Sequence, residues 1–374
     1  MLFGERIAPY TSCMAGARGD DIQRLIVFLP NWVGDLVMAT PILEALRRQL
    51  PAARIAVLLR PHLSPVLAGG GWHDAELHWP ARGRMLGHDG LMHLARAIRK
   101  QQFDAALMLT NSFRSAAAAW LAGIPRRIGY ARDGRGLLLT DRLHPPKHGG
   151  QFVPTALINY FAPLAERLGV AVSDRRTRLG VTPDEERAAR ELLQHYGLMT
   201  SAADGPAACV QPYAVINPGA AFGAAKCWLP ERFAQVCDAL NEQCGLTSLI
   251  CGAPREAPLM RLIASHARRR VICCENPGTS LGSLKPLIRD AAVLVCNDSG
   301  PRHYGIALGT PTVTIFGPTH QEWTHTDGAG EIRLQEPVEC GPCQLRVCPL
   351  DHRCMRGVRA EHVMAAAAAV MRQS

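Results

Sequence analysis

The chain has 374 residues, of which 48% are hydrophobic and 20% charged, and its formal net charge is +9. This composition is typical of a soluble globular protein with room for two domains, and it excludes a disordered chain. No apolar run approaches the ~20 residues needed to cross a bilayer, and the first twenty residues lack the pattern of a signal peptide. The basic balance favours an acidic partner: nucleic acid, an anionic membrane surface or a phosphorylated substrate.

The first half of the chain alternates predicted strands with predicted helices. Such alternation indicates a parallel sheet with helices on both faces. We expect a loose extension over residues 1–21 and a first Rossmann-like domain over residues 22–198. The predicted strands are Arg24–Leu29, Ile55–Leu59, Ala75–His78, Ala105–Leu109 and Arg127–Tyr130; the predicted helices are Leu36–Leu50, Leu91–Lys100, Ser115–Leu121, Phe152–Leu168 and Pro183–His195.

Gly34 and Asp35 directly follow the first predicted strand, at the start of the first long helix. A glycine at this position lets the backbone approach a substrate, and a carboxylate there is placed to act as a general base. Aspartate is also favoured at helix N-caps, so a purely structural role is the alternative. Pro41 falls in the first turns of this helix, where proline is tolerated.

Five arginines concentrate in the later part of the first domain. This pattern predicts either a surface for an anionic acceptor or a solvated basic face. The arginines are Arg114, Arg126, Arg127, Arg132 and Arg135.

Residues 199–212 lose periodicity and are rich in Ala, Ser, Gly and Pro, which predicts an interdomain linker. A second α/β series over residues 213–374 predicts a second Rossmann-like domain that ends in a helix. Two doubly wound domains in tandem predict a ligand cleft between the facing strand ends. The second series comprises predicted strands Tyr213–Ile216, Thr247–Cys251, Val271–Cys274, Val293–Cys296 and Thr312–Phe316, and predicted helices Glu231–Gln243, Ala257–His266, Leu284–Ala291 and His303–Leu308.

Two glycine-containing turns, residues 217–228 and 297–303, each follow a predicted buried strand and lead into a helical stretch. Turns of this kind hold phosphates in α/β proteins, because helix N-termini attract anions. The first turn contains Lys226, whose spacing from Gly219 and Gly223 fails the Walker pattern. Together the turns predict a diphosphate site, with a nucleotide-sugar as the natural ligand.

The side chains in these turns also have simpler interpretations. Lys226 either neutralises a diphosphate as a point charge or is a solvated lysine. The amides of Ser299 and Gly300 are placed to face an anion, and His303 either bonds a phosphate or caps the helix.

The chain has thirteen cysteines, several of them inside predicted strands and helices, which favours reduced thiols in the cytoplasm. Four of them, Cys340, Cys343, Cys348 and Cys354, form a segment over residues 340–354 with metal-like spacing. This segment predicts either a structural zinc or iron–sulfur site or a reduced, cysteine-rich loop.

Taken together, these motifs resemble the lipopolysaccharide heptosyltransferases of glycosyltransferase family nine, most closely the heptosyltransferase II branch. The resemblance covers about residues 24–372 in collinear order. Arg302 and Tyr304 depart from it, because smaller apolar residues surround the equivalent of His303 in the family. The residues that carry it are Trp32–Asp35, Asn111–Ser115 with Ala122–Pro125, Pro218–Trp228, Asn297–Gly300 and His303.

The resemblance implies a glycosyltransferase B fold and inverting transfer of heptose from ADP-heptose to the lipopolysaccharide inner core. It implies that Asp35 deprotonates the acceptor hydroxyl and that Lys226 contacts the diphosphate. No Asp-x-Asp occurs in the chain, so we expect no catalytic metal and no required cofactor. The donor-binding set is then Gly34, Ala221, Phe222, Lys226, Asp298, Ser299, Gly300 and His303, and the acceptor-binding set is Asn111, Arg114 and Arg132.

An acceptor made of lipid A and inner-core sugars implies peripheral contact with the anionic cytoplasmic face of the inner membrane. Two alternatives remain at this point. One is a related transferase that uses another nucleotide-sugar or another surface glycan. The other is a non-enzymatic nucleotide- or nucleic-acid-binding protein, which is disfavoured because the chain has no helix-turn-helix signature and no aromatic-basic stacking motif.

Overall fold

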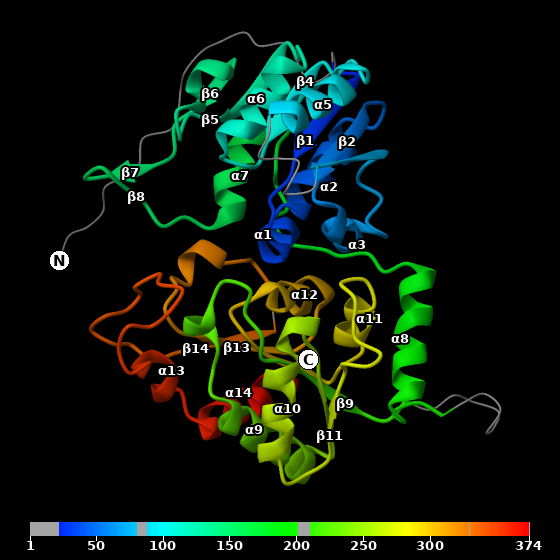
Figure 1. Cartoon of the computed structure of the whole chain (residues 1–374), viewed down its shortest axis with the longest axis vertical. Helices are drawn as coiled ribbons and strands as arrows, with labels where there is room; N and C mark the ends of the chain where they lie inside the picture. Colours follow the sequence, from blue (N-terminus) through cyan, green and yellow to red (C-terminus); the bar gives the residue numbers. More distant parts are fainter. Residues whose placement is uncertain (1–21, 81–87, 201–209, 329, 374) are drawn as a thin grey trace.

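The structure, a computed structural model, describes residues 22–80, 88–200, 210–328 and 330–373. It has two α/β lobes, one built from the first half of the chain and the other from the second half (Figure 1). Each lobe contains a six-stranded sheet in which all neighbouring strands run parallel. The predicted pair of Rossmann-like folds is therefore confirmed. No helix in the described part of the chain is long and apolar enough to cross a membrane.

The first sheet has the strand order β3-β2-β1-β4-β5-β6. One of its faces packs against α1, α2 and α7, and the other packs against α5 and α6. The strands are β1 (Arg24–Phe28), β2 (Arg54–Leu59), β3 (Ala75–His78), β4 (Ala105–Met108), β5 (Arg126–Tyr130) and β6 (Asp141–Leu143), and the helices are α1 (Val33–Met38), α2 (Thr40–Gln49), α3 (Ser64–Leu67), α5 (His88–Arg99), α6 (Phe113–Leu121) and α7 (Leu157–Glu166).

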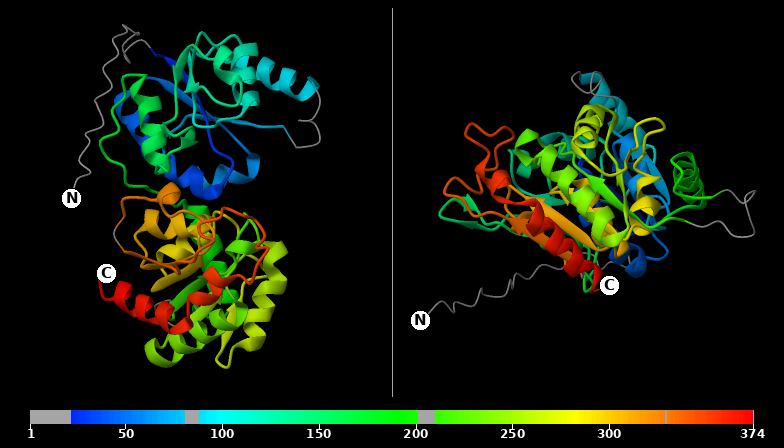
Figure 2. Two further views of the ribbon diagram at one scale, coloured as in Figure 1. Left: turned by 90° about the vertical axis from the view of Figure 1, so that its left-hand side faces the viewer. Right: turned by 90° about the horizontal axis from the view of Figure 1, so that it is seen from below.

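The second sheet repeats this order as β11-β10-β9-β12-β13-β14. Helices α9, α10 and α14 cover one face, while α11 and α12 cover the other, which is turned toward the first lobe (Figure 2). The strands are β9 (Tyr213–Asn217), β10 (Thr247–Ile250), β11 (Val271–Cys273), β12 (Val293–Asn297), β13 (Thr312–Phe316) and β14 (Glu331–Gln335), and the helices are α8 (Pro183–His195), α9 (Pro230–Cys244), α10 (Ala257–His266), α11 (Leu284–Arg289), α12 (Gly300–Leu308), α13 (Arg353–Gly357) and α14 (Ala360–Met371).

The first long predicted helix is split in two at Ala39. Pro41 has no N–H to donate to the carbonyl of Val37, so the regular hydrogen-bond ladder is interrupted. The hydroxyl of Thr40 donates to that carbonyl instead, at 2.8 Å. The prediction of one continuous helix was wrong at this point, and α1 is a short separate helix that carries Asp35.

The predicted helix over Phe152–Leu168 was also wrong at its start. Residues Lys147–His148 (β7) and Gln151–Phe152 (β8) form a small antiparallel hairpin, and α7 begins only at Leu157. Pro154 lies between hairpin and helix and disfavours helical geometry in the residue before it. The hairpin places Phe152 beside the end of the first sheet.

The two lobes are in direct contact. Helices α1 and α12 pack together, and one core of buried residues includes side chains from both sheets. The buried Lys285 of α11 donates to the carbonyl of Ala68 in the first lobe at 2.8 Å and pairs with Glu185 of α8 at 2.9 Å. Because α1 follows β1 and α12 follows β12, these contacts bring the carboxyl ends of the two sheets together.

The division into domains stays a prediction at its boundaries. The predicted extension 1–21 and most of the predicted linker 199–212 lie outside the described residues. Helix α8, which the prediction assigned to the first domain, packs against α11 of the second lobe.

Candidate active site

Asp35 lies in the first turn of α1, at the interface between the lobes. Trp32 is the N-cap residue of this helix, so Asp35 does not occupy the capping position. Burial raises the pKa of Asp35 to about 6; the charge of Lys226 opposes the shift and that of Asp298 adds to it. Both of these residues belong to the second lobe, and α1 packs against α12 of that lobe. Asp35 therefore lies on the side of the interface that meets the two glycine-containing turns, residues 217–228 and 297–303, which are called the donor turns below.

Gly34 allows this close approach. A Cβ atom at position 34 would lie 2.6 Å from Cδ2 of the His303 ring, so any larger residue would push the lobes apart. His303 is itself buried, and burial together with the charge of Arg302 lowers its pKa to about 3. Its imidazole is therefore neutral at physiological pH, and a bonded phosphate would meet a neutral ring.

Lys226 is buried in the second lobe and contacts Asp298. Its Nζ donates to the carboxylate of Asp298 and, at 3.1 Å, to the backbone carbonyl of the same residue. It also lies 5.0 Å from the centroid of the Phe222 ring. The alternative of a solvated lysine is wrong, because only 11% of the side chain is exposed.

The two donor turns are tied together by the side chain of Asn297. Its amide nitrogen donates to the carbonyl of Pro218 at 2.6 Å, and its amide oxygen accepts from the backbone N–H of Trp228 at 3.2 Å. Ser299 is the N-cap residue of α12, which begins at Gly300. The hydroxyl oxygen of Ser299 is buried and has no hydrogen-bond partner among the described residues, so a polar group stands unpaired at the start of this helix.

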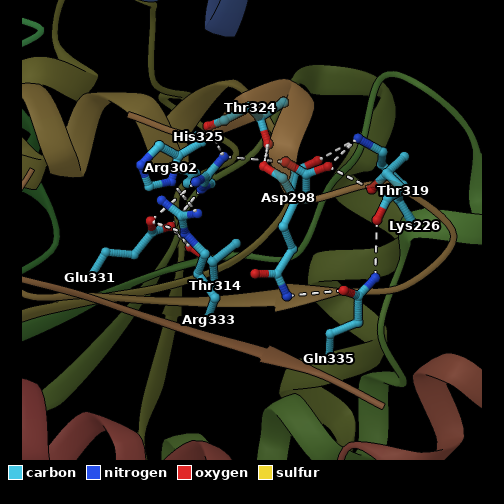
Figure 3. Close-up of polar contacts among 11 residues, drawn as sticks. Lys226, Asp298, Arg302, Thr314, Thr319, Thr324, His325, Glu331, Arg333 and Gln335 are labelled. Atoms are coloured by element: carbon cyan, nitrogen blue, oxygen red, sulfur yellow. Dashed lines mark hydrogen bonds and ion pairs between the residues drawn. The ribbon is translucent and has the colours of Figure 1, made fainter. Parts of the chain in front are cut away.

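Arg302 connects Asp298 to the far edge of the second sheet (Figure 3). This fully buried guanidinium forms a two-pronged pair with Glu331 and lies 3.6 Å from Asp298. Burial raises the pKa of Glu331, but Arg302 and Arg333 outweigh that effect and lower it to about 2. Burial likewise raises the pKa of Asp298, and Lys226 and Arg302 hold it below its ordinary value. Both carboxylates are therefore ionised at neutral pH.

The sequence interpretation noted Arg302 only as a departure from the family. The i,i+4 spacing from Asp298 to Arg302 is the signal that suggests an ion pair. Glu331 has no such local signal, because it comes from a different strand.

The cysteine-rich segment packs directly against the first donor turn. The backbone N–H of Ala225 donates to the carbonyl of Arg346 at 3.1 Å, and Arg346 Nε donates to the carbonyl of Phe222 at 2.7 Å. Nε2 of His352 lies 2.8 Å from the carbonyl oxygen of Ala225. Gly223 is required here, because a Cβ atom would lie 2.3 Å from the carbonyl oxygen of Arg346.

The metal hypothesis for this segment gains no support. Its four cysteines line one small cavity as free thiols. Within the described ranges there is no group of three or more His, Cys, Asp or Glu side chains arranged to hold a metal ion. The segment's hydrogen bonds through Arg346 and His352 brace the donor turn. Its cysteines are Cys340, Cys343, Cys348 and Cys354.

On the first-lobe side, Asn111 follows β4 at the same sheet edge as Asp35. Its Oδ1 accepts from the Tyr160 hydroxyl at 3.3 Å and from Arg135 at 3.2 Å. Arg132 follows β5 and interacts with the same Tyr160 hydroxyl. Arg114 lies half-buried in the first turn of α6. The predicted acceptor residues thus come from the loops that follow β4 and β5.

The other three arginines of the predicted basic surface have structural roles, so that part of the prediction was wrong. Arg135 is fully buried and donates to the carbonyls of Tyr130 and Thr110. Arg126 pairs with Asp141, and Arg127 donates to the carbonyl of Leu138. Backbone carbonyl groups at loops and strand ends have no partner in the regular hydrogen-bond ladders, and these guanidiniums donate to them. The spacing of the arginines in the sequence does not reveal such contacts.

The structure therefore places the Asp35 carboxylate, whose pKa is raised, on the opposite side of the interface from Lys226 and the N-terminus of α12. A base of this kind accepts a proton from an acceptor hydroxyl, and cationic and amide donors stabilise a departing diphosphate. Two Rossmann-like lobes with their carboxyl sheet edges on either side of one site have the architecture of the glycosyltransferase B fold.

Comparison with known proteins identifies the family. The model of glycosyltransferase family 9 (heptosyltransferase) matches residues 91–353. The chain belongs to this family.

Individual relatives agree with this assignment. The lipooligosaccharide heptosyltransferase 2 of Haemophilus influenzae is 28% identical over 328 residues, which cover 84% of this chain and 89% of the relative. The structure of the Escherichia coli ADP-heptose lipopolysaccharide heptosyltransferase II matches with a TM-score of 0.74 and 22% identity, covering 94% of this chain and 99% of that one. A heptosyltransferase from the same organism, solved with ADP, matches with a TM-score of 0.66 and 16% identity over 93% of this chain and 100% of that one.

Proposed function

We propose that this glycosyltransferase moves heptose from ADP-heptose to the inner core of lipopolysaccharide, with inversion at the anomeric carbon and without a catalytic metal. The observation that carries the proposal is the position of Asp35 on α1, a helix that packs against α12 of the opposite lobe, where the charges of Lys226 and Asp298 act on its carboxyl group. The names of the Haemophilus influenzae and Escherichia coli relatives support the choice of sugar and acceptor.

In the proposed reaction, the carboxylate of Asp35 takes the proton from the acceptor hydroxyl as the oxygen attacks the anomeric carbon. A single displacement of this kind inverts that carbon, because the nucleophile enters opposite the leaving ADP. Lys226 and the amides at the start of α12 stabilise the negative charge on the departing diphosphate. Lys226 must then exchange part of its contact with Asp298 for a contact with the diphosphate.

A donor panel tests this function. The full-length protein is incubated with inner-core lipopolysaccharide that ends one heptose short, and with ADP-heptose or other nucleotide-sugars. We expect release of ADP and an acceptor whose mass increases by one heptose, with a chelator leaving the rate unchanged. Transfer from a different nucleotide-sugar would favour the alternative of a related transferase, and strict dependence on magnesium would contradict the proposed leaving-group chemistry.

We also propose that the protein meets the anionic cytoplasmic face of the inner membrane through its first lobe. Residues 22–182, which leave out helix α8 of the second lobe, hold 21 Lys and Arg against 10 Asp and Glu. Each basic residue near such a surface contributes about 1 kcal/mol, and the attraction is screened within ~10 Å at 0.1 M salt. Sedimentation with anionic liposomes should therefore show binding at low salt that is lost at high salt; binding that persists at 1 M salt would contradict the electrostatic attraction.

A further inference from the structure

A basic pocket with a volume of about 340 Å³ lies at the edge of the first lobe. It lies between the loop that follows β5 and the β7–β8 hairpin, both of which Figure 1 shows at the side of that lobe. Its polar lining includes Arg132, Asp133, His144 and Lys147, and Phe152 supplies an aromatic wall. Of these residues, only Arg132 has been given a role above, as a member of the predicted acceptor-binding set.

The hairpin fixes the spacing of the pocket's cations. Lys147 and Phe152 are paired across the two strands, so their side chains share one face. Lys147 Nζ lies 4.8 Å from the centroid of the Phe152 ring, and the guanidinium carbon of Arg132 lies 4.2 Å from the same centroid. The ring attracts both cations and therefore holds two like charges near each other.

Positive charge in this pocket exceeds the negative charge that faces it. Asp133 is the acidic residue of the lining, and its carboxylate is 58% exposed and lies 3.9 Å from Arg132 Nε. That nitrogen is buried and has no hydrogen-bond partner among the described residues. A fork-shaped guanidinium with a buried, unpaired donor beside a lysine matches the geometry of a carboxylate or phosphate group.

The pocket is also correctly placed to hold part of the acceptor. It lies at the carboxyl end of β5, the same sheet edge from which Asp35 projects after β1. The strand order β1-β4-β5 puts the strands that lead to the two sites two positions apart, which is about 10 Å between strand axes. The Tyr160 hydroxyl joins Arg132 to Asn111, which follows β4, the strand between β1 and β5.

From this geometry we propose that the pocket binds an anionic group, a carboxylate or a phosphate, on a sugar of the acceptor next to the one that receives heptose. Arg132 and Lys147 hold the anion, and Phe152 positions both cations. This inference rests on the proposed function, since it assumes a saccharide acceptor that extends from Asp35 along the sheet edge.

The test compares Lys147→Gln, Arg132→Gln and the charge-preserving Lys147→Arg with wild type. Lys147 is exposed on the hairpin, so its replacement should leave folding intact. The matched control is Lys100→Gln, an exposed lysine that precedes β4 at the opposite edge of the sheet. Each Gln variant in the pocket should raise the acceptor KM at least about 10-fold and leave the KM for ADP-heptose unchanged, whereas Lys147→Arg and Lys100→Gln should remain close to wild type.

Modified acceptors identify the anion. Acceptor treated with phosphatase and acceptor with reduced carboxyl groups are each assayed with wild type and with Lys147→Gln. The modification that removes the bound group should raise the acceptor KM of wild type as much as Lys147→Gln does. The same modification should leave the acceptor KM of Lys147→Gln unchanged. An unchanged acceptor KM in both Gln variants would overturn the inference while wild-type transfer still upheld the proposed function. If wild type transfers no heptose to either native or modified acceptor, the proposed function itself fails.

Discussion

The two lobes have the same strand order but carry different charges. Residues 22–182 of the first lobe hold 21 basic and 10 acidic residues, whereas residues 183–198 and 213–374 of the second lobe hold 18 basic and 18 acidic residues. In the second lobe the charges at the centre of the site are buried and mutually paired, as Lys226, Asp298, Arg302 and Glu331 demonstrate. In the first lobe, Arg132 and Lys147 line an open pocket with little opposing charge.

Under the proposed function, one scaffold serves two kinds of ligand. Both lobes present loops at the carboxyl edge of a parallel sheet, which is where α/β proteins bind ligands. A buried, pre-paired network keeps donor-side groups in a fixed geometry for a diphosphate that always has the same shape. In the proposed acceptor site, an open pocket whose two cations face one exposed carboxylate suits a larger saccharide that carries its own negative charge.

The largest expected effect concerns Asp35, the first-lobe residue that faces the second-lobe network. Asp35→Asn should lower turnover by roughly 10²–10⁴-fold and leave ADP binding almost intact, because it removes the general base. Steady-state kinetics and calorimetry measure the two quantities. Asp184→Asn, at an exposed position in the first turn of α8, is the control. Near-normal turnover in Asp35→Asn would require another base.

The same substitution should also stabilise the fold. Folding raises the pKa of Asp35 from 3.8 to about 6, so the folded state binds the proton of this carboxyl group more tightly than the unfolded state does. The contribution of Asp35 to the free energy of unfolding therefore decreases as the pH rises from 3.8 through 6, and it does not return above that range. At pH 7.5 the uncharged Asn should raise the free energy of unfolding by up to about 3 kcal/mol. In wild type, kcat/KM should fall as pH drops below about 6.

The second prediction tests whether the buried network of the second lobe is structural. Arg302→Met leaves Glu331 and Asp298 without their shared cation, and loss of one partner of a buried pair costs about 3–5 kcal/mol. Denaturant unfolding at pH 7 measures this loss. Since the pKa of Glu331 falls from 4.5 to about 2, the contribution of this pair is complete above pH 4.5 and disappears as pH falls through 2. A change below 1 kcal/mol at pH 7 would mean that the network is solvated.

The next largest effect is expected for Lys226→Ala. Removal of this cation should weaken ADP binding by about 1.5–3 kcal/mol, the value of a hydrogen bond to a charged group. Titration calorimetry with ADP gives the affinity directly, and Lys100→Ala in the first lobe serves as control. Unchanged ADP affinity would show that Lys226 stays with Asp298 throughout the reaction.

The smallest effect is expected for Arg346, which braces the first donor turn from the cysteine-rich segment. Arg346→Ala removes its hydrogen bond to the carbonyl of Phe222, worth about 1 kcal/mol. The KM for ADP-heptose should rise several-fold while kcat and the acceptor KM stay unchanged. Arg353→Ala, at an exposed position in the same segment, is the control. Equal effects of the two variants would argue for a general loss of segment structure.

Local pattern was sufficient for most of the regular structure. The predicted strands Ala75–His78 and Thr312–Phe316 and the predicted helix Ala257–His266 agree with β3, β13 and α10, because hydrophobic runs and helical periodicity are properties of neighbouring residues. The hairpin at Lys147–Phe152 was missed, since two-residue strands carry too little pattern.

The sequence by itself determined the α/β class, the family and the two glycine-containing turns that follow β9 and β12. It also singled out Asp35 and Lys226 through their places after strand ends. Only the tertiary structure decided which charges meet: Glu331 reaches Arg302 from another strand, and Arg135 is buried whereas Arg132 lines a pocket. The physical reason is that local pattern depends on neighbours in the chain, whereas burial and charge pairing depend on residues that only the packing of sheets and lobes brings together.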